Sequence, residues 1–273
     1  MLLFNQKCWG RFARKDWLVK GDRNSSYFQR RANIHRKKQE ITKLKDDAGI
    51  WIYEPRDIAQ KILLDYTEHF KSLYRTPRTI HALGLPCLIS QEDNEQLTRL
   101  PATEEIKKAV FDINPSKTPG SDSFSTEFFQ HYRELVEREL IECIKIFFLH
   151  GKLLKEINHT FITLVPKNAQ PHMTSHFHPI SLCSTIYKII SKILASRLRL
   201  LLDKLVSPFQ STFIPGRSIH DNILITHESM HKFKMAKGKT MWIAIKLDMK
   251  KAYDELEWDF LFACLAQLGF HTR

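Results

Sequence analysis

Apolar residues at helical spacing recur through most of this chain, and the clearest run lies between residues 184 and 205. There isoleucine and leucine return every three or four positions, and Pro208 follows the run. Because this spacing places apolar side chains on one side of a helix, it predicts long amphipathic helices that pack on a shared core. The same spacing predicts further helices after Pro55, from Thr103 to Asn114, up to His150, from about Ser218 to Met235 and from about Leu256 to Leu268.

Strand patterns are fewer and short. The stretch Glu40–Tyr53 predicts a β-hairpin, because "DDAG" in its middle supplies turn-forming residues. His159–Lys167 predicts a strand that Pro166 closes, and Met241–Asp248 alternates apolar and polar residues as a half-buried strand does. The predicted fold class is therefore α+β and helix-rich.

Proline and glycine divide the chain into segments. The interval 76–101 carries Pro77, Gly84, Pro86 and Pro101 without sustained periodicity, so we expect a linker there. A connector with the hairpin and one helix would occupy residues 1–75, and a second domain would occupy residues 102–273. Within that domain, "PSKTPGSDSF" at 115–124 predicts a loop.

Composition narrows the class of protein. The chain has 273 residues, of which 43% are hydrophobic and 26% are charged, and no apolar run approaches the roughly 20 residues of a membrane span. Its first residues, "MLLFNQKCWGRF", lack the pattern of a secretory signal. Five scattered cysteines without a CxxC pair favour reduced thiols. We therefore expect an intracellular protein, nuclear or cytoplasmic, without a membrane partner.

Positive charge is concentrated near the N-terminus. Thirteen Lys or Arg stand against three acids between Lys7 and Lys45, so this stretch carries ten of the chain's twelve net positive charges. Aromatic residues such as Trp9 and Tyr27 are interleaved with them, as in surfaces that bind nucleic acid. A solvated basic surface is the other interpretation. The candidate nucleic-acid-binding residues are Arg11, Arg14, Lys15, Arg30, Arg31, Arg36, Lys37 and Lys38.

Three charged residues stand where strands or turns end. Asp248 closes the alternating strand, Lys167 follows another strand in "LVPK", and Arg217 follows the turn in "PGR". A carboxylate at a strand end is a rigid mount for a Mg²⁺ ion, and an ammonium nearby suits a polyphosphate. Each residue taken alone also fits an ordinary surface charge. His172, His176 and His178 lack a nearby cysteine or carboxylate, so we do not expect a zinc site.

In chain order, these residues fall within a series of recognisable blocks. They read "NPSKTPGSDSFSTEFFQ", "LLKEINHTFITLVPK", "SHFHPISLCSTIYKIISKILASRL", "SPFQSTFIPGRSIHDNILITHE" and "IAIKLDMKKAYDELEWDFL". The series closely resembles the reverse transcriptase (RNA-directed DNA polymerase) of a plant-type non-LTR, LINE-like retrotransposon. The stretch from Trp17 to Trp51 resembles the connector before the polymerase domain of such elements. The resemblance implies a partial right-hand polymerase fold, with fingers and an incomplete palm.

The resemblance also implies a role for each matching residue. Asp248 is the expected catalytic Mg²⁺ ligand, and Tyr253 is expected to pack under the incoming sugar. Lys167 is expected to approach the triphosphate, and Arg217 lies in a block of template and fingers contacts. Asp254 and Glu105 are expected to be structural. The implied partners are an RNA template, a DNA primer or target, and deoxynucleoside triphosphates.

The chain departs from the family pattern at several positions. His178 stands where an arginine normally grips the incoming phosphates, and a neutral imidazole lacks the fixed charge of a guanidinium. Ser121 and Ser123 replace a proline and a glycine, so a positive φ at position 123 would strain the serine. Glu255 adds a negative charge beside the expected metal site.

The paired aspartates of the family's second catalytic block do not occur after Asp248. We therefore expect a truncated reverse transcriptase domain at 102–273 that is inactive by itself. The alternatives are a non-catalytic RNA- or DNA-binding remnant and a transposon relic without function. Because the palm would then lack partner strands, we also expect the isolated chain to be poorly soluble.

Overall fold

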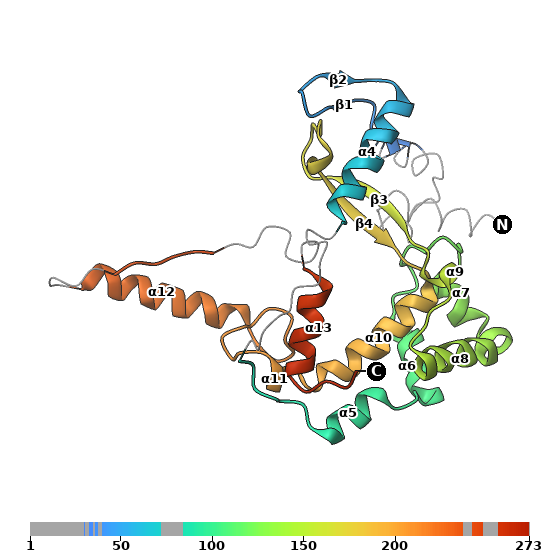
Figure 1. Ribbon diagram of the computed structural model, residues 1–273, viewed down its shortest axis with the longest axis vertical. Helices are drawn as coiled ribbons and strands as arrows, with labels where there is room; N and C mark the ends of the chain where they lie inside the picture. Colours follow the sequence, from blue (N-terminus) through green and yellow to red (C-terminus); the bar gives the residue numbers. More distant parts are fainter. Residues whose placement is uncertain are drawn as a thin grey trace. The chain divides into compact units, whose positions relative to one another are not determined.

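The computed structural model describes residues 30, 33–34, 36–37, 40–71, 84–236, 242–247 and 256–272. The chain forms two compact units whose segments alternate along the sequence. The first comprises residues 1–71, 113–133 and 154–185, and the second comprises residues 72–112, 134–153 and 186–273. Helices outnumber strands in the described part, and each sheet there has two strands, so the fold is α+β and helix-rich (Figure 1).

The first unit begins with the predicted hairpin, which is confirmed. Strand β1 (Leu44–Lys45) pairs antiparallel with β2 (Trp51–Ile52). Asp46 closes the turn, because its carboxylate accepts a hydrogen bond from the Ile50 N–H at 2.7 Å. Gly49 has φ +83°, a conformation that glycine adopts without strain. Helix α4 (Pro55–His69) follows, with Pro55 in its first turn, as the sequence predicts.

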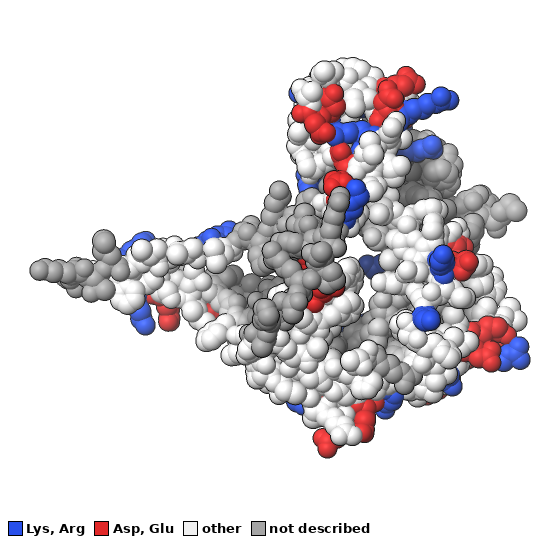
Figure 2. Space-filling model, in the orientation of Figure 1, with Lys and Arg blue, Asp and Glu red and all other residues white. Residues whose placement is uncertain are grey.

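A small core forms on the inner side of this hairpin. Alternation along β1 and β2 turns Leu44 and Ile52 inward, where they pack with Ile58 of α4 and with Phe177. Leu44 is completely buried. On the outside, Lys61 of α4 bonds to Asp47 at 2.7 Å and to Asp65 at 2.8 Å. Figure 2 accordingly shows acidic and basic side chains intermixed over the hairpin and α4.

A longer antiparallel ribbon completes the first unit. Strand β3 (Phe161–Pro166), which is the predicted strand, pairs with β4 (Phe177–Leu182) in the register Val165 opposite His178. The sequence analysis did not predict β4, which contains Pro179. A proline is tolerated at the edge of a sheet, where its missing N–H has no partner to lose. The short helices of this unit are α7 (Thr126–His131), α9 (Lys155–Asn158) and the 3₁₀ turn η1 (Thr174–His176).

Helices make up the second unit. They are α5 (Gln91–Thr98), α6 (Thr103–Asp112), most of α8 (Arg133–His150), most of α10 (Thr185–Arg199), α11 (Leu202–Leu205), α12 (Ile219–Met235) and α13 (Trp258–Gln267). The predicted stripe of α10 is buried at Ile189, Ile190 and Ile193. Ile106 of α6 and Ile144 of α8 are also buried. None of the described helices combines the length and the hydropathy that crossing a bilayer requires.

Two predicted long helices are interrupted, which corrects the sequence analysis. The helix predicted to run to His150 is divided at Tyr132, which has φ −98° and ψ 30° and ends α7. The helix predicted between Ser184 and Leu205 is divided after Arg199. There the N–H groups of Leu200 and Leu201 bond three residues back instead of four, which tightens the chain and ends α10.

Two other segments also differ from expectation. Helix α5 lies inside the interval 76–101 that was predicted to be a linker. Polar bonds set its start: the Ser90 hydroxyl accepts from the Asp93 N–H, and the Asp93 carboxylate accepts from the Ser90 N–H, each at 3.1 Å. Residues 242–247 of the predicted Met241 strand form no strand, because no partner among the described residues pairs with them.

Candidate nucleotide site

Lys167 and His178 lie on the same side of the β3–β4 ribbon. His178 is opposite Val165, and the Lys167 N–H donates to the His176 carbonyl at 2.9 Å, which continues the ladder by one step. Lys167 and His178 are therefore diagonal neighbours, and both side chains are exposed. Phe177 points to the opposite side and is buried in the core with Leu44. The ribbon thus presents an ammonium and an imidazole together at its outer surface.

The Lys167 ammonium has a local partner that a ligand could replace. Its Nζ donates to the Ser175 carbonyl at 2.8 Å, in the turn that joins the two strands. A single neutral carbonyl satisfies only one of the three ammonium donors. An incoming phosphate would offer charged oxygens to the remaining two donors.

The loop 115–124 packs against the end of β4 and the start of α10. A Cβ atom placed on Gly120 would lie 2.5 Å from the Ser184 backbone nitrogen, so only glycine fits there. The Thr185 hydroxyl donates to the Phe124 carbonyl at 2.7 Å, and the Ser184 hydroxyl donates to the Ile157 carbonyl at 2.8 Å. Parts of the first three sequence blocks, which span 114–130, 153–167 and 175–198, therefore meet in the first unit.

Serine 123 adopts the strained conformation that the sequence analysis anticipated. Its φ is +60°, in the left-handed region that favours glycine. Phe124 compensates in part, because its N–H donates to the Asp122 carboxylate at 3.2 Å. Ser121 replaces the expected proline without a positive φ, and its hydroxyl donates to the His159 carbonyl at 3.2 Å.

Arg217 organises a loop in the second unit. Its guanidinium donates to the carbonyls of Ser207 at 2.6 Å and Gln210 at 2.8 Å, and to the Asp203 carboxylate at 3.1 Å. Asn222 donates from its amide to the Phe209 carbonyl at 3.0 Å and so closes the same loop. The observed role of Arg217 is therefore structural, and its contact with a nucleotide stays a prediction.

Several predicted site residues lie outside the described part of the chain. These are Asp248, Tyr253, Asp254, Glu255, Arg11, Arg14, Lys15, Arg31 and Lys38. Arg30, Arg36 and Lys37 of the basic stretch are described and exposed. Across the described ranges, no three side chains of the metal-ligand types gather in one place.

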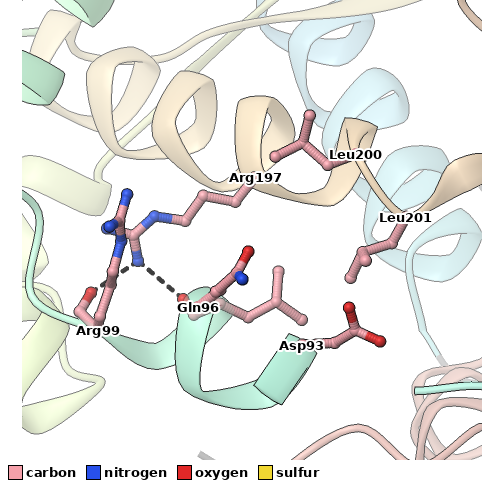
Figure 3. A pocket seen from close by; sticks show the side chains of 7 residues that line it. Asp93, Gln96, Arg99, Arg197, Leu200 and Leu201 are labelled. Atoms are coloured by element: carbon pink, nitrogen blue, oxygen red, sulfur yellow. Dashed lines mark hydrogen bonds between the residues drawn. The ribbon is translucent and has the colours of Figure 1, made fainter. Parts of the chain in front are cut away.

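Sequence reasoning missed one buried charged residue, Arg197 of α10. Its guanidinium bonds to both carboxylate oxygens of Glu105, at 2.8 and 3.0 Å, and to the carbonyls of Leu97 and Arg99, at 2.8 and 2.7 Å. Figure 3 shows the side chain reaching from α10 to the end of α5, beside a small pocket. The guanidinium also lies over the Phe148 ring, 4.9 Å from its centroid. With its donors held in this way, Arg197 braces α10 against α5 and α6.

The partner of Arg197 is ionised more readily than an ordinary glutamate. The hydrogen bonds from Arg197 lower the pKa of Glu105 below its usual 4.5, although partial burial opposes the shift. Glu105 was expected to be structural, and this ion pair gives it that role. The signal was present in the sequence, because Arg197 continues the buried series Ile189, Ile190 and Ile193 at helical spacing.

Comparison with known proteins shows what the sequence of this chain is similar to. Residues 165–273 match the family "Reverse transcriptase (RNA-dependent DNA polymerase)". The chain is 27% identical over 260 residues to a "Transposon TX1 uncharacterized 149 kDa protein" of Xenopus laevis, covering 94% of this chain and 20% of that protein. It is 25% identical over 170 residues to the "Retrovirus-related Pol polyprotein from type-1 retrotransposable element R2" of Popillia japonica, covering 62% of this chain and 22% of that protein. The chain thus spans about a fifth of the length of these relatives.

Proposed function

We propose that this protein, which is related to the reverse transcriptases of non-LTR retrotransposons, contributes the fingers and the first palm motif of an RNA-directed DNA polymerase. The match of residues 165–273 to the family carries the proposal. That region begins within β3 and contains Lys167, His178, Arg217, Asp248 and Tyr253. The plant-type origin stays a prediction, since the relatives named above come from a frog and a beetle.

The β3–β4 ribbon supports a role in holding the triphosphate. Lys167 would donate to the phosphates in place of its bond to the Ser175 carbonyl. His178, the diagonal neighbour, would supply a second but weaker contact, because a neutral imidazole offers one donor and no fixed charge. The glycine-dependent packing of loop 115–124 brings it against the backbone of Cys183 and Ser184, next to the end of β4.

The catalytic step is assigned to residues outside the described part. Asp248 would hold a divalent cation, expected to be Mg²⁺, and Tyr253 would pack beneath the sugar of the incoming nucleotide. Bound as a pair, such cations neutralise the attacking and leaving oxygens of nucleotidyl transfer. Paired aspartates of the kind in the family's second block do not occur after Asp248, so Asp248 would need further carboxylates to complete the ligand set.

Sequencing the transcript beyond the codon for Arg273 is the first test. If the frame continues into paired aspartates, the protein of that frame should extend a DNA primer on an RNA template with Mg²⁺. Asp248→Ala should abolish the extension. A control variant, Glu142→Ala, removes an exposed carboxylate from α8, outside all of the blocks quoted above, and should leave the extension intact. Extension that persists in the Asp248→Ala protein would overturn the assignment of Asp248.

A second candidate function is nucleic-acid binding without catalysis. The concentration of positive charge between Lys7 and Lys45 favours it. In that case the protein would bind RNA or DNA with a steep salt dependence, Asp248→Ala would not change the affinity, and no primer would be extended. The protein would act where its nucleic acid is, in the nucleus or the cytoplasm.

A further inference from the structure

The outer side of the β1–β2 hairpin carries four side chains of two chemical kinds. Alternation turns Lys43, Lys45, Trp51 and Tyr53 away from the core that holds Leu44 and Ile52. Lys45 is directly opposite Trp51 in the ladder. We call these four residues the Trp51 surface. It lies entirely within the first unit and outside residues 165–273, which match the reverse transcriptase family.

Two ammonium groups share one indole ring on this surface. The Nζ atom of Lys43 lies 4.6 Å from the Trp51 ring centroid, and the Nζ atom of Lys45 lies 5.0 Å from it. Within the described ranges neither ammonium bonds to a carboxylate. Lys61 on the nearby α4 differs, because Asp47 and Asp65 neutralise it. Lys43 and Lys45 therefore concentrate positive charge that no carboxylate in the described ranges neutralises.

The aromatic rings remain open to solvent. Tyr53 is 64% exposed and Trp51 is 37% exposed, and their ring centroids are 6.4 Å apart. His172, from the turn between β3 and β4, lies beside Trp51 at a centroid distance of 6.1 Å. The His172 carbonyl accepts from the Lys45 N–H at 2.7 Å, which holds this turn against the hairpin. The rings thus stand on rigid backbone, where aromatic residues replace the polar ones usual on an outer strand surface.

We propose that the Trp51 surface binds a short run of single-stranded nucleic acid, whose phosphates contact Lys43 and Lys45 and whose bases stack on Trp51 and Tyr53. A phosphate between the two ammonium groups would relieve their mutual repulsion. Flat, solvent-exposed rings next to unpaired cations suit unpaired bases, which present π faces that a duplex hides. In the proposed polymerase, this would be a contact with the template or target strand, made by residues other than Lys167 and His178 of the nucleotide site, so the inference rests in part on the proposed function.

Binding to labelled oligonucleotides tests this surface directly. The full chain would be titrated against a fluorescein-labelled oligouridylate and an oligothymidylate of equal length, with anisotropy recorded at several KCl concentrations. A duplex of the same length is the third ligand. We expect both single strands to bind more tightly than the duplex, and the ratio of the two single-strand affinities identifies RNA or DNA as the favoured source.

Four variants separate charge from stacking. Replacing both lysines (Lys43→Gln with Lys45→Gln) should weaken binding at least tenfold and make the slope of log K against log salt shallower by about 1.4, since each lost phosphate contact on a single strand contributes about 0.7. Trp51→Ala and Tyr53→Ala should each weaken binding about tenfold without changing that slope. Lys71→Gln is the matched control. It removes one positive charge, as each of the two lysine changes does, from an exposed lysine that pairs with Glu68 at 2.6 Å, and it should leave the affinity within twofold.

The possible outcomes lead to different conclusions. If the lysine and aromatic variants bind as tightly as Lys71→Gln does, or if the duplex is preferred, the Trp51 surface is not a single-strand site. Circular dichroism of each variant checks folding. Tyr53→Ala is the aromatic variant that should disturb the core least, because the Tyr53 ring is the more exposed of the two. If no primer is extended but the oligonucleotides still bind as expected, the proposed polymerase function fails and the Trp51 surface remains a single-strand site.

Discussion

At the scale of single residues, Ser123 holds a backbone conformation that suits glycine better than serine. The backbone there has φ +60°, which costs a serine on the order of 1 kcal/mol. Ser123→Gly should therefore stabilise the protein by about 0.5–1 kcal/mol, even though glycine raises the entropy of the unfolded chain. Urea denaturation measures the difference. Ser116→Gly, at an exposed position of the same loop without a positive φ, should be neutral or destabilising.

Glu105 gives the protein an acid-sensitive contribution to stability. Because Arg197 depresses the pKa of Glu105 in the folded state, this contribution is complete above the unfolded value of about 4.5 and is lost as the pH falls through the lower folded value. Glu105→Gln should cost about 2 kcal/mol at pH 7, and the cost should shrink as the pH falls below the unfolded value of about 4.5.

The neighbouring Glu104 provides the control for this prediction. Its side chain is 82% exposed and lies 4.0 Å from Lys107, so Glu104→Gln should change stability by less than about 0.5 kcal/mol. Urea denaturation of the three proteins across the same pH range compares them. If the loss in free energy of unfolding caused by Glu105→Gln stays constant with pH, the role assigned to the ion pair is wrong.

His178 is the residue at which nucleotide affinity should be easiest to improve. An arginine there would add a fixed charge and a bidentate donor beside Lys167 on the ribbon. His178→Arg should tighten binding of a fluorescent deoxynucleoside triphosphate about tenfold or more. His150→Arg adds the same charge at the end of α8 and should leave the affinity within twofold. Equal gains in both variants would mean that general attraction, not the ribbon, holds the triphosphate.

At the scale of elements, the sequence predicted helices where apolar residues recur at helical spacing. Helix α10 follows its isoleucine stripe, and β3 ends at Pro166 as expected. Helix α5 was not predicted, because Leu97 is its one apolar residue, so it has no helical apolar period, and its start depends on polar bonds at Ser90 and Asp93. Strand β4 was not predicted, because a proline interrupts the usual strand pattern and residues 167–176 separate β4 from β3 by more than a tight hairpin turn.

The stability of helix α5 should accordingly depend on the residue that caps its N-terminus, Ser90. Ser90→Ala removes the acceptor of the Asp93 N–H and should cost about 1 kcal/mol. The effect should spread to the C-terminal helix α13, because Asn94 of α5 donates to the Gly269 carbonyl at 2.7 Å and accepts from the His271 N–H at 2.8 Å. Hydrogen exchange at residues 88–98 and 264–271 would show faster opening of both segments.

Ser229→Ala is the matched control for the cap. Its hydroxyl donates to the Ile225 carbonyl within α12, at 2.8 Å, and caps nothing. This change should alter stability by less than about 0.5 kcal/mol. If both variants lose the same stability, the capping box does not set the start of α5.

At the scale of the whole molecule, the sequence indicated the class of fold but not its division. Two units with alternating segments arise from contacts between distant residues, such as Thr174 with Asp65 in one unit and Arg197 with Glu105 in the other. No local period records such contacts. The candidate site was predictable where it lies on one hairpin, because Lys167 and His178 are neighbours through the pairing of β3 with β4. The hydrogen bonds of Arg217 within its own loop were not predictable, because no local sequence pattern indicates them.

Exposed apolar surface should govern how the isolated chain behaves in solution. Ile243, Ile245 and Leu247 are 77–88% exposed, and α12 has no buried residue although it carries Ile223, Leu224 and Ile225. Unpaired extended segments and bare apolar helices associate with other chains to remove this surface from water. We expect the protein to form concentration-dependent oligomers, which sedimentation velocity would detect. Replacing Ile243, Ile245 and Leu247 with lysine should shift the distribution toward monomer. The control changes Lys232→Gln and Lys234→Gln on α12 should not shift it. A wild-type chain that stays monomeric as its concentration rises would show that the three apolar side chains are covered in solution.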